Sequence, residues 1–146
     1  MDIREVSPAE AHDILERDLA AVYLDVRTEG EFEGGHPAGA RNVPVVLFDP
    51  ATRRPVANPG FLPTVEHHLP RTTRLVVGCG SGMRSMKACE ILTHAGYTDV
   101  VNVRGGFDGA RDRAGQVIEP GWREAGLPVE MGQTPGACYA DLAAKR

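Results

Sequence analysis

The amino-acid sequence predicts an α/β domain built on a mostly parallel β-sheet. Short apolar runs that suit buried strands alternate with segments whose apolar residues recur at helical spacing, an alternation typical of α/β folds. The chain has 146 residues, the size of one ordinary domain. Hydrophobic residues make up 42% of the chain and charged residues 25%, as in soluble globular proteins.

A helix start signal directly follows the first predicted strand. A short strand is predicted at residues 2–6. Ser7 and Glu10 then have the spacing of a capping box, and Pro8 occupies the first helical position. We therefore expect an amphipathic helix that begins directly after Ser7.

The next segment predicts two further strands around a short helix. Residues 22–26 are short and apolar enough to form a buried strand. Thr28 and Glu31 form a second capping box, which predicts the short helix, and another strand is expected at residues 41–43. Residues 44–59 are polar and rich in proline, and a connection of this length predicts a surface loop or lid.

The middle of the chain contains the clearest pattern. A helix with an apolar face is predicted over residues 58–69. Residues 75–77 predict a buried strand that runs directly into the small residues 78–82. A second helix follows and ends near Gly96, and residues 100–103 predict the last strand.

The C-terminal third is less regular. Residues 107–126 predict a short helix, a loop and a second short helix. Their charged side chains favour a solvated surface segment, with a lid over a site as the alternative. Because residues after 131 show little pattern, we place the domain at residues 1–131 and a C-terminal tail at 132–146.

Charge and cysteine content narrow the possible classes of function. The net charge of −4 does not favour nucleic acid, whose binding proteins usually carry a basic surface. No stretch approaches the roughly 18 apolar residues of a membrane span, and the first residues lack the apolar run of a secretory signal. The three cysteines are an odd number, unlike an extracellular disulfide framework. We therefore expect a cytoplasmic location and no membrane partner.

Cys79 carries the strongest functional signal. It follows the predicted strand at residues 75–77, and ligands bind beyond the carboxyl ends of strands in open parallel sheets. The small residues after it allow backbone N–H groups to form an anion-binding nest, and the next helix adds the positive end of its dipole. Arg84 contributes a full positive charge. Each feature favours thiolate over thiol, which predicts a nucleophilic sulfur and an anionic substrate.

Other interpretations of the cysteines remain open at this point. Cys79 is alternatively a buried, inert thiol that happens to end a strand. No metal site is expected, because Cys79 and Cys89 are ten residues apart and no Cys/His set has zinc spacing. Cys89 lies on an apolar helical stripe and predicts core packing. For Cys138 we expect an exposed thiol in the tail, with acceptance of sulfur from Cys79 as a second hypothesis.

The cysteine loop resembles a known family. Residues 79–85, CGSGMRS, resemble the C-x-x-G-x-R-S loop of rhodanese-type sulfurtransferases. Residues 24–44 resemble the upstream block of that family, with Pro37 at a position where an aliphatic residue is usual. Residues 105–107, and later Trp122 with residues 125–128, resemble its closing block, although about ten extra residues separate the two halves. The resemblance covers about residues 3–131.

The resemblance implies both a fold and a mechanism. The fold is a five-stranded, mainly parallel sheet with helices on both faces. Cys79 attacks the outer sulfur of thiosulfate, a polysulfide or a persulfide, and cyanide or a thiol then removes that sulfur from the Cys79 persulfide. Arg84 orients the donor and stabilises the departing charge, and no cofactor is required. A protein is a further possible acceptor. The donor is held by the backbone amides of Gly80, Ser81, Gly82, Met83 and Ser85.

Two other functions compete with this one. Cysteine phosphatases and arsenate reductases have a wider C-x5-R loop, whereas this chain has C-x4-R, which suits a single sulfur atom better than a phosphate. A protein-specific sulfur carrier or binding module is also compatible with Cys79 and Arg84. The first loop residues additionally resemble mercaptopyruvate sulfurtransferases, in which a small hydroxyl residue usually stands at the position of Arg84.

Three charged or titratable residues near the predicted site have mainly structural interpretations. Asp25 and Arg27 end a strand at the same sheet edge as Cys79, and we expect an ion pair that braces loops, with substrate contact as the alternative. His36 lies in a glycine-rich turn, where a hydrogen bond that holds the turn is expected and a general base is the alternative.

Overall fold

The computed structural model describes residues 3–145. Its centre is a five-stranded sheet in which every neighbouring pair of strands is parallel, with the order β1-β8-β7-β2-β4. The parallel α/β fold predicted from the sequence is therefore confirmed. The strands are β1 (Arg4–Val6), β2 (Val22–Asp25), β4 (Arg41–Asn42), β7 (Leu75–Gly78) and β8 (Val100–Val103).

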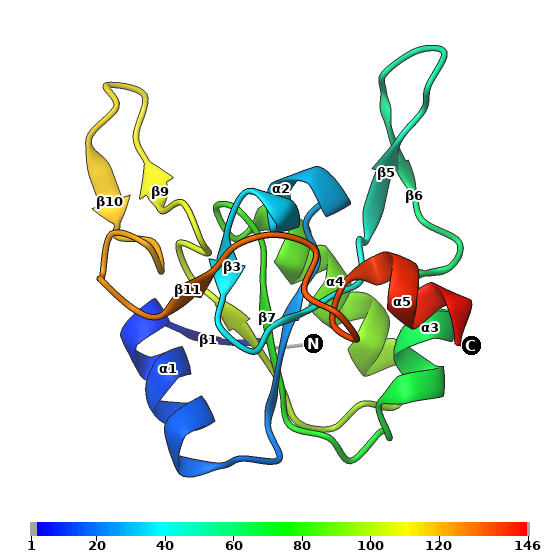
Figure 1. Ribbon diagram of the computed structural model, residues 1–146. Coiled ribbons are helices and arrows are strands. Elements are labelled where there is room, and N and C mark those ends of the chain that lie inside the picture. Colours follow the sequence, from blue (N-terminus) through cyan, green and yellow to red (C-terminus); the bar gives the residue numbers. More distant parts are fainter. Residues whose placement is uncertain (1–2, 146) are drawn as a thin grey trace.

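Helices cover both faces of this sheet (Figure 1). One side carries α1, and the other carries α3, α4 and α5. The short helix α2 follows β2 at the carboxyl end of the sheet. The helices are α1 (Pro8–Arg17), α2 (Glu29–Glu33), α3 (Phe61–His68), α4 (Met83–His94) and α5 (Tyr139–Ala144).

The two central strands send alternate side chains to the two faces. Tyr23 and Val76 belong to the cluster on the α1 side, whereas Leu24 and Val77 belong to the cluster on the α4 side. Because both faces of the sheet are buried, the amino-acid sequences of these strands are nearly continuous apolar runs. Cys79 lies two residues after Val77, and this alternation places it on the α4 side.

Both predicted capping boxes are present. The Ser7 hydroxyl accepts a hydrogen bond from the Glu10 N–H over 3.1 Å, and the Glu10 carboxylate accepts one from the Ser7 N–H over 2.8 Å. Thr28 and Glu31 make the same reciprocal pair over 3.3 and 3.1 Å. The second box positions Glu31 at the carboxyl end of the sheet, beside the predicted site.

The connection at residues 44–59 is more ordered than a loop. It contains an antiparallel hairpin of β5 (Val46–Phe48) and β6 (Pro55–Ala57). The Asp49 side chain accepts hydrogen bonds from the N–H groups of Ala51 and Thr52, which builds the turn between the strands.

The prediction of two short helices within residues 107–126 is wrong. This segment contains a second hairpin, formed by β9 (Ala110–Arg111) and β10 (Val117–Glu119). The side chain of Asp112 accepts hydrogen bonds from two backbone N–H groups in the turn, and Gly115 adopts a φ of 83° there. Hydrogen bonds within the turn therefore determine the structure of this segment, and the weakly helical spacing of its apolar residues does not.

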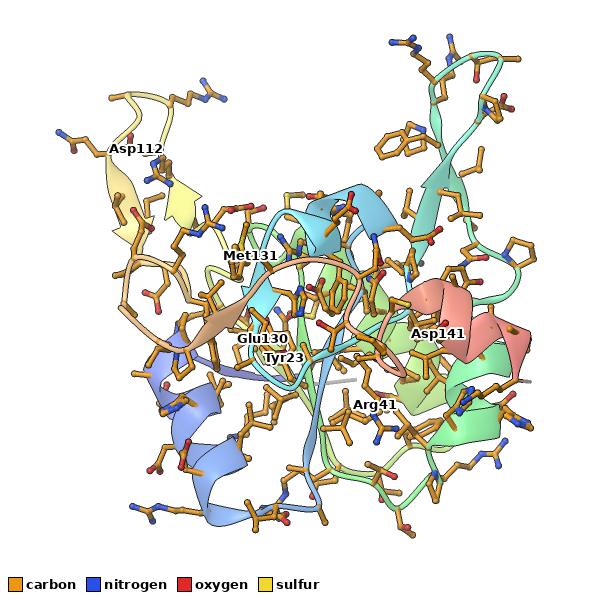
Figure 2. All side chains as sticks on the ribbon, in the orientation of Figure 1. Tyr23, Arg41, Asp112, Glu130, Met131 and Asp141 are labelled. Atoms are coloured by element: carbon orange, nitrogen blue, oxygen red, sulfur yellow. The ribbon has the colours of Figure 1, made fainter. Side chains whose placement is uncertain are left out.

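The two hairpins rise on either side of α2, at the same end of the molecule (Figure 1). Side chains project into solvent along both of them, with Asp112 far out on the β9–β10 hairpin (Figure 2). None of the helices within residues 3–145 is long and apolar enough to cross a membrane.

The residues after 128 fold back onto the domain. β11 (Val129–Glu130) pairs antiparallel with β3 (His36–Pro37), and Leu142 of α5 joins the core cluster on the α4 side. Cys138 precedes α5 and is only 5% exposed, so the exposed thiol expected at this position is wrong. The cause is tertiary packing, which the weak local pattern does not reveal.

Candidate active site

Cys79 lies directly after β7, at the end of the sheet where α4 begins. Its side chain is 1% exposed. The backbone N–H of Gly82 donates a hydrogen bond to the Cys79 sulfur over 3.1 Å. Gly82 precedes the first residue of α4 and adopts a φ of 112°, in the left-handed region that favours glycine. The loop therefore curls around the sulfur and brings the N-terminal end of α4 to it.

Arg84 is held by Glu31. Its two terminal nitrogens donate hydrogen bonds to the two carboxylate oxygens of Glu31, over 2.7 and 2.9 Å. Burial by itself raises the pKa of Glu31, but hydrogen bonds from Arg84 and from the Thr28 backbone outweigh burial and lower that pKa to about 2. The same pairing raises the pKa of Arg84. The two side chains therefore form a bidentate ion pair beside the cysteine loop.

The remaining predicted loop residues have different environments. Gly80 is buried, whereas Ser81 is exposed and the side chain of Met83 is 82% exposed. Ser85 is buried, and its hydroxyl lies within hydrogen-bonding distance of the Gly82 carbonyl and of Oδ1 of Asn102 on β8. The Ser85 side chain thus braces the loop against β8.

The segment after β8 closes against the cysteine loop. The Phe107 N–H donates to the Cys79 carbonyl and the Asp108 N–H donates to the Gly80 carbonyl, both over 2.8 Å. Gly106 adopts a φ of 54°, and a Cβ there would collide with the Cys79 carbonyl oxygen. Only glycine allows this close approach of the two backbones.

Asp108 belongs to the charged segment for which a solvated surface was favoured and a lid over the site was the alternative, and its side chain lies at the site. A Cβ added at Gly80 would lie 3.2 Å from the Asp108 carboxylate and 3.3 Å from a terminal nitrogen of Arg84. The side chains of Asp108 and Arg84 therefore both lie beside Gly80. The position of Asp108 just beyond the carboxyl end of β8 is a signal of the kind that identified Cys79.

Two clefts lie beside the Arg84–Glu31 pair, and Glu31 lines both. The larger, of about 610 Å³, lies between α2 and the β5–β6 hairpin, and the smaller has a volume of about 230 Å³. We call them the hairpin cleft and the small cleft. The hairpin cleft is lined by Thr28, Glu31, Val46, Phe48, Pro55 and Arg84, and the small cleft by Arg27, Gly30, Glu31, Gly34, Gly35, Phe107, Asp108 and Arg123.

The expected ion pair between Asp25 and Arg27 is present and deeply buried. A terminal nitrogen of Arg27 lies 2.7 Å from the Asp25 carboxylate and donates to the Gly35 carbonyl over the same distance. Burial lowers the pKa of Arg27, but the hydrogen bond to Asp25 outweighs it and the net shift is upward. The guanidinium also lies 4.5 Å from the centre of the Phe107 ring. The pair thus joins the end of β2 to the segments around the site.

His36 and Cys89 both have structural surroundings. The ring of His36 is completely buried, stacks on Phe32, and has its two nitrogens 2.7 Å from the Phe32 carbonyl and 3.1 Å from the Thr134 hydroxyl. These contacts agree with the predicted role of His36, a hydrogen bond that holds the turn. Cys89 lies in the core as predicted, and burial raises the pKa of its thiol to about 12. Within residues 3–145, no group of three or more His, Cys, Asp or Glu side chains is placed to hold a metal ion.

Comparison with known proteins supports one family. A family model described as "Rhodanese-like domain" matches residues 7–112. "Thiosulfate sulfurtransferase 16, chloroplastic" from Arabidopsis thaliana is 40% identical over 126 residues, covering 86% of this chain and 91% of the relative. "Senescence-associated protein DIN1" from Raphanus sativus is 38% identical over 117 residues, covering 78% of this chain and 56% of the relative. This chain therefore spans little more than half the length of the Raphanus protein.

Solved structures give the same result. The crystal structure of Rv0390 from M. tuberculosis superposes with a TM-score of 0.73 at 31% sequence identity, covering 90% of this chain and all of the other. The thiosulfate sulfurtransferase from Pseudomonas aeruginosa superposes with a TM-score of 0.63 at 25% identity, covering 98% of this chain and 24% of that chain. The sheet, the cysteine loop and these matches lead to one assignment: the chain belongs to the family of rhodanese-like domains.

Proposed function

We propose that this protein is a sulfurtransferase that carries sulfane sulfur as a persulfide on Cys79. The observation that carries the proposal is the hydrogen bond from the Gly82 N–H to the Cys79 sulfur, in a loop that ends at the N-terminus of α4. A backbone donor and a helix dipole directed at one sulfur atom stabilise negative charge on it. Relatives named as thiosulfate sulfurtransferases support the same chemistry.

The reaction has two displacement steps. In the first, the Cys79 thiolate attacks the outer sulfur of the donor, a new S–S bond forms, and the donor's own bond to that sulfur breaks. With thiosulfate the electron pair leaves on sulfite, and Cys79 becomes a persulfide anion. In the second, cyanide or a thiolate attacks the terminal sulfur and Cys79 leaves as the thiolate. The loop N–H groups hold the negative charge in both steps.

The acceptor and the cellular location stay predictions. The acceptor is proposed to be cyanide, a small thiol or a protein thiol, with no nucleic acid or membrane involved. The cytoplasmic location remains an expectation from the sequence, and the Arabidopsis relative described above is named as chloroplastic.

Intact-protein mass spectrometry tests the proposal. After incubation with polysulfide or thiosulfate, the protein should gain the mass of one sulfur atom at Cys79 and lose it with cyanide. Cys79→Ser should show no cyanide-labile gain, because a hydroxyl oxygen cannot form a persulfide. Cys89→Ala removes a buried core thiol and should load normally. If no donor loads Cys79 in the folded protein, the proposal is wrong, and a phosphatase assay and a search for a protein partner follow.

A further inference from the structure

We propose that the sulfur donor of this protein is an organic persulfide, and that Glu31 and Phe48 select it over thiosulfate. The inference rests on the proposed function, since it concerns the loading of Cys79. It deepens that function by naming the class of donor and two residues that determine specificity.

Glu31 neutralises the positive charge of Arg84. This arginine is the cation that the sequence assigns to an anionic donor, yet Glu31 occupies both terminal nitrogens over 2.7 and 2.9 Å. The capping box holds the Glu31 carboxylate in place through the Thr28 N–H and hydroxyl. A dianion such as thiosulfate must therefore displace an anchored carboxylate or bind beside it, and each alternative is electrostatically unfavourable.

The charged side chains near Gly80 include carboxylates as well as guanidinium groups. The Asp108 carboxylate lies beside Gly80 together with Arg84, so the small cleft contains a second negative charge. Of the two arginines that line the small cleft, Arg27 is paired with Asp25. Arg123 places its guanidinium 4.8 Å from the centre of the Phe107 ring. Arg84 and Arg123 are thus balanced by Glu31 and Asp108, which leaves no excess positive charge for a dianion or for the sulfite that would leave.

The hairpin cleft has an apolar wall. Val46, Phe48 and Pro55 of the β5–β6 hairpin face the Arg84–Glu31 pair across a cleft of about 610 Å³. Phe48 is 55% exposed, so its ring offers apolar surface that a ligand can cover. Thiosulfate has no carbon atoms with which to use this surface. The hydrocarbon body of an organic persulfide can pack against it, and Arg84 joins this cleft to the cysteine loop, since it lines the cleft and also lies beside Gly80.

The proposed loading step is balanced without any further reactant. The Cys79 thiolate attacks the outer sulfur of R–S–SH, the bond between the two donor sulfurs breaks, and its electron pair leaves on the R–S sulfur. The proton on the attacked outer sulfur passes to the departing R–S sulfur, which leaves as R–SH, and Cys79 becomes a persulfide anion. The departing group is a neutral thiol, which suits a site without excess positive charge.

Glu31→Gln tests the role of the Glu31 charge. Glutamine keeps the capping box but removes the negative charge that holds Arg84. The second-order rate constant for loading Cys79 is measured by quenched mass spectrometry with thiosulfate and with 2-hydroxyethyl persulfide. We expect the thiosulfate constant to rise about tenfold in Glu31→Gln, and the ratio of the thiosulfate constant to the persulfide constant to rise with it.

A matched control separates this effect from the overall charge of the protein. Glu29 is exposed on the same helix, and Glu29→Gln removes the same charge. It should leave both constants unchanged. A thiosulfate constant that falls or stays constant in Glu31→Gln overturns the role of Glu31, as does an equal rise in Glu29→Gln.

Phe48→Ser tests the role of the apolar wall. The readout is the ratio of the loading constants for benzyl persulfide and 2-hydroxyethyl persulfide, which should fall about fivefold when the ring is removed. Ile118→Ser removes an exposed apolar side chain from the other hairpin and should leave the ratio unchanged. An unchanged ratio in Phe48→Ser overturns the role of Phe48. Failure of every donor to load the wild-type protein would instead refute the proposed function.

Discussion

The backbone N–H of Gly82 points at the sulfur of Cys79, and the two atoms lie 3.1 Å apart. Gly82 is also the residue that precedes the first turn of α4, and its φ of 112° lies in the left-handed region. One backbone conformation therefore both begins the helix and directs a hydrogen-bond donor at the Cys79 sulfur. We expect the proposed reactivity of Cys79 to depend on this conformation.

Gly82→Ala should slow the loading of Cys79 with sulfur by about tenfold, because a hydrogen bond to a charged sulfur is weakened. An added Cβ has room, since its nearest neighbours are backbone atoms of Gly105 and Val103 at 3.6 Å. The strain comes instead from the positive φ, and relief of that strain turns the N–H away. Quenched mass spectrometry with polysulfide measures the rate.

Gly115→Ala is the matched control for this variant. Gly115 has a φ of 83° in the β9–β10 turn, and an added Cβ would have no neighbour within 4 Å. The backbone strain is similar, but the position is remote from Cys79, so loading should proceed at the wild-type rate. Equal rates in the two alanine variants would contradict the role assigned to the Gly82 N–H.

Asp25→Asn should lower the free energy of unfolding by about 3–5 kcal/mol, because it leaves the Arg27 guanidinium buried without its carboxylate. The two side chains are only 1% and 3% exposed. Denaturant titration followed by circular dichroism measures the loss. Asp13→Asn breaks the exposed pair with Arg17 and should change the free energy by less than about 1 kcal/mol. Similar losses in both variants would contradict the importance of burial.

The contribution of Glu31 to stability should depend on pH. Its pKa falls from an ordinary 4.5 to about 2 in the folded protein, so the unfolded chain binds the proton more readily. The stabilisation is therefore complete above about pH 4.5 and is lost as the pH falls towards 2. Because the pair is partly exposed to solvent, we expect a modest effect.

The measurement compares wild type with Glu31→Gln by urea denaturation between pH 6 and 2. The wild-type protein should be the more stable at pH 6, and the difference in the free energy of unfolding should shrink as Glu31 becomes protonated. The same series with Glu29→Gln reports the effect of removing an exposed charge from the same helix. A difference between wild type and Glu31→Gln that stays constant over the whole range would contradict the lowered pKa of Glu31.

Most of the fold could be predicted because its signals are local. The capping boxes at Ser7 and Thr28 need only residues three positions apart. The strand before Cys79 is a continuous apolar run, which a sheet buried on both faces requires. The β9–β10 hairpin was not predicted, since its stability depends on turn hydrogen bonds to Asp112 rather than on apolar periodicity.

The sequence by itself determined the parallel sheet, its capped helices and the placement of Cys79 in the loop between β7 and α4, because short-range patterns encode strand ends and helix starts. Only the tertiary structure decided that Arg84 meets Glu31, a residue 53 positions away, and that Asp108 lies beside Gly80. Such contacts depend on how strand ends converge at one edge of the sheet, which no local pattern specifies. The physical reason is that electrostatic pairing acts through space, and the charges around the nucleophile come from three separate segments of the chain.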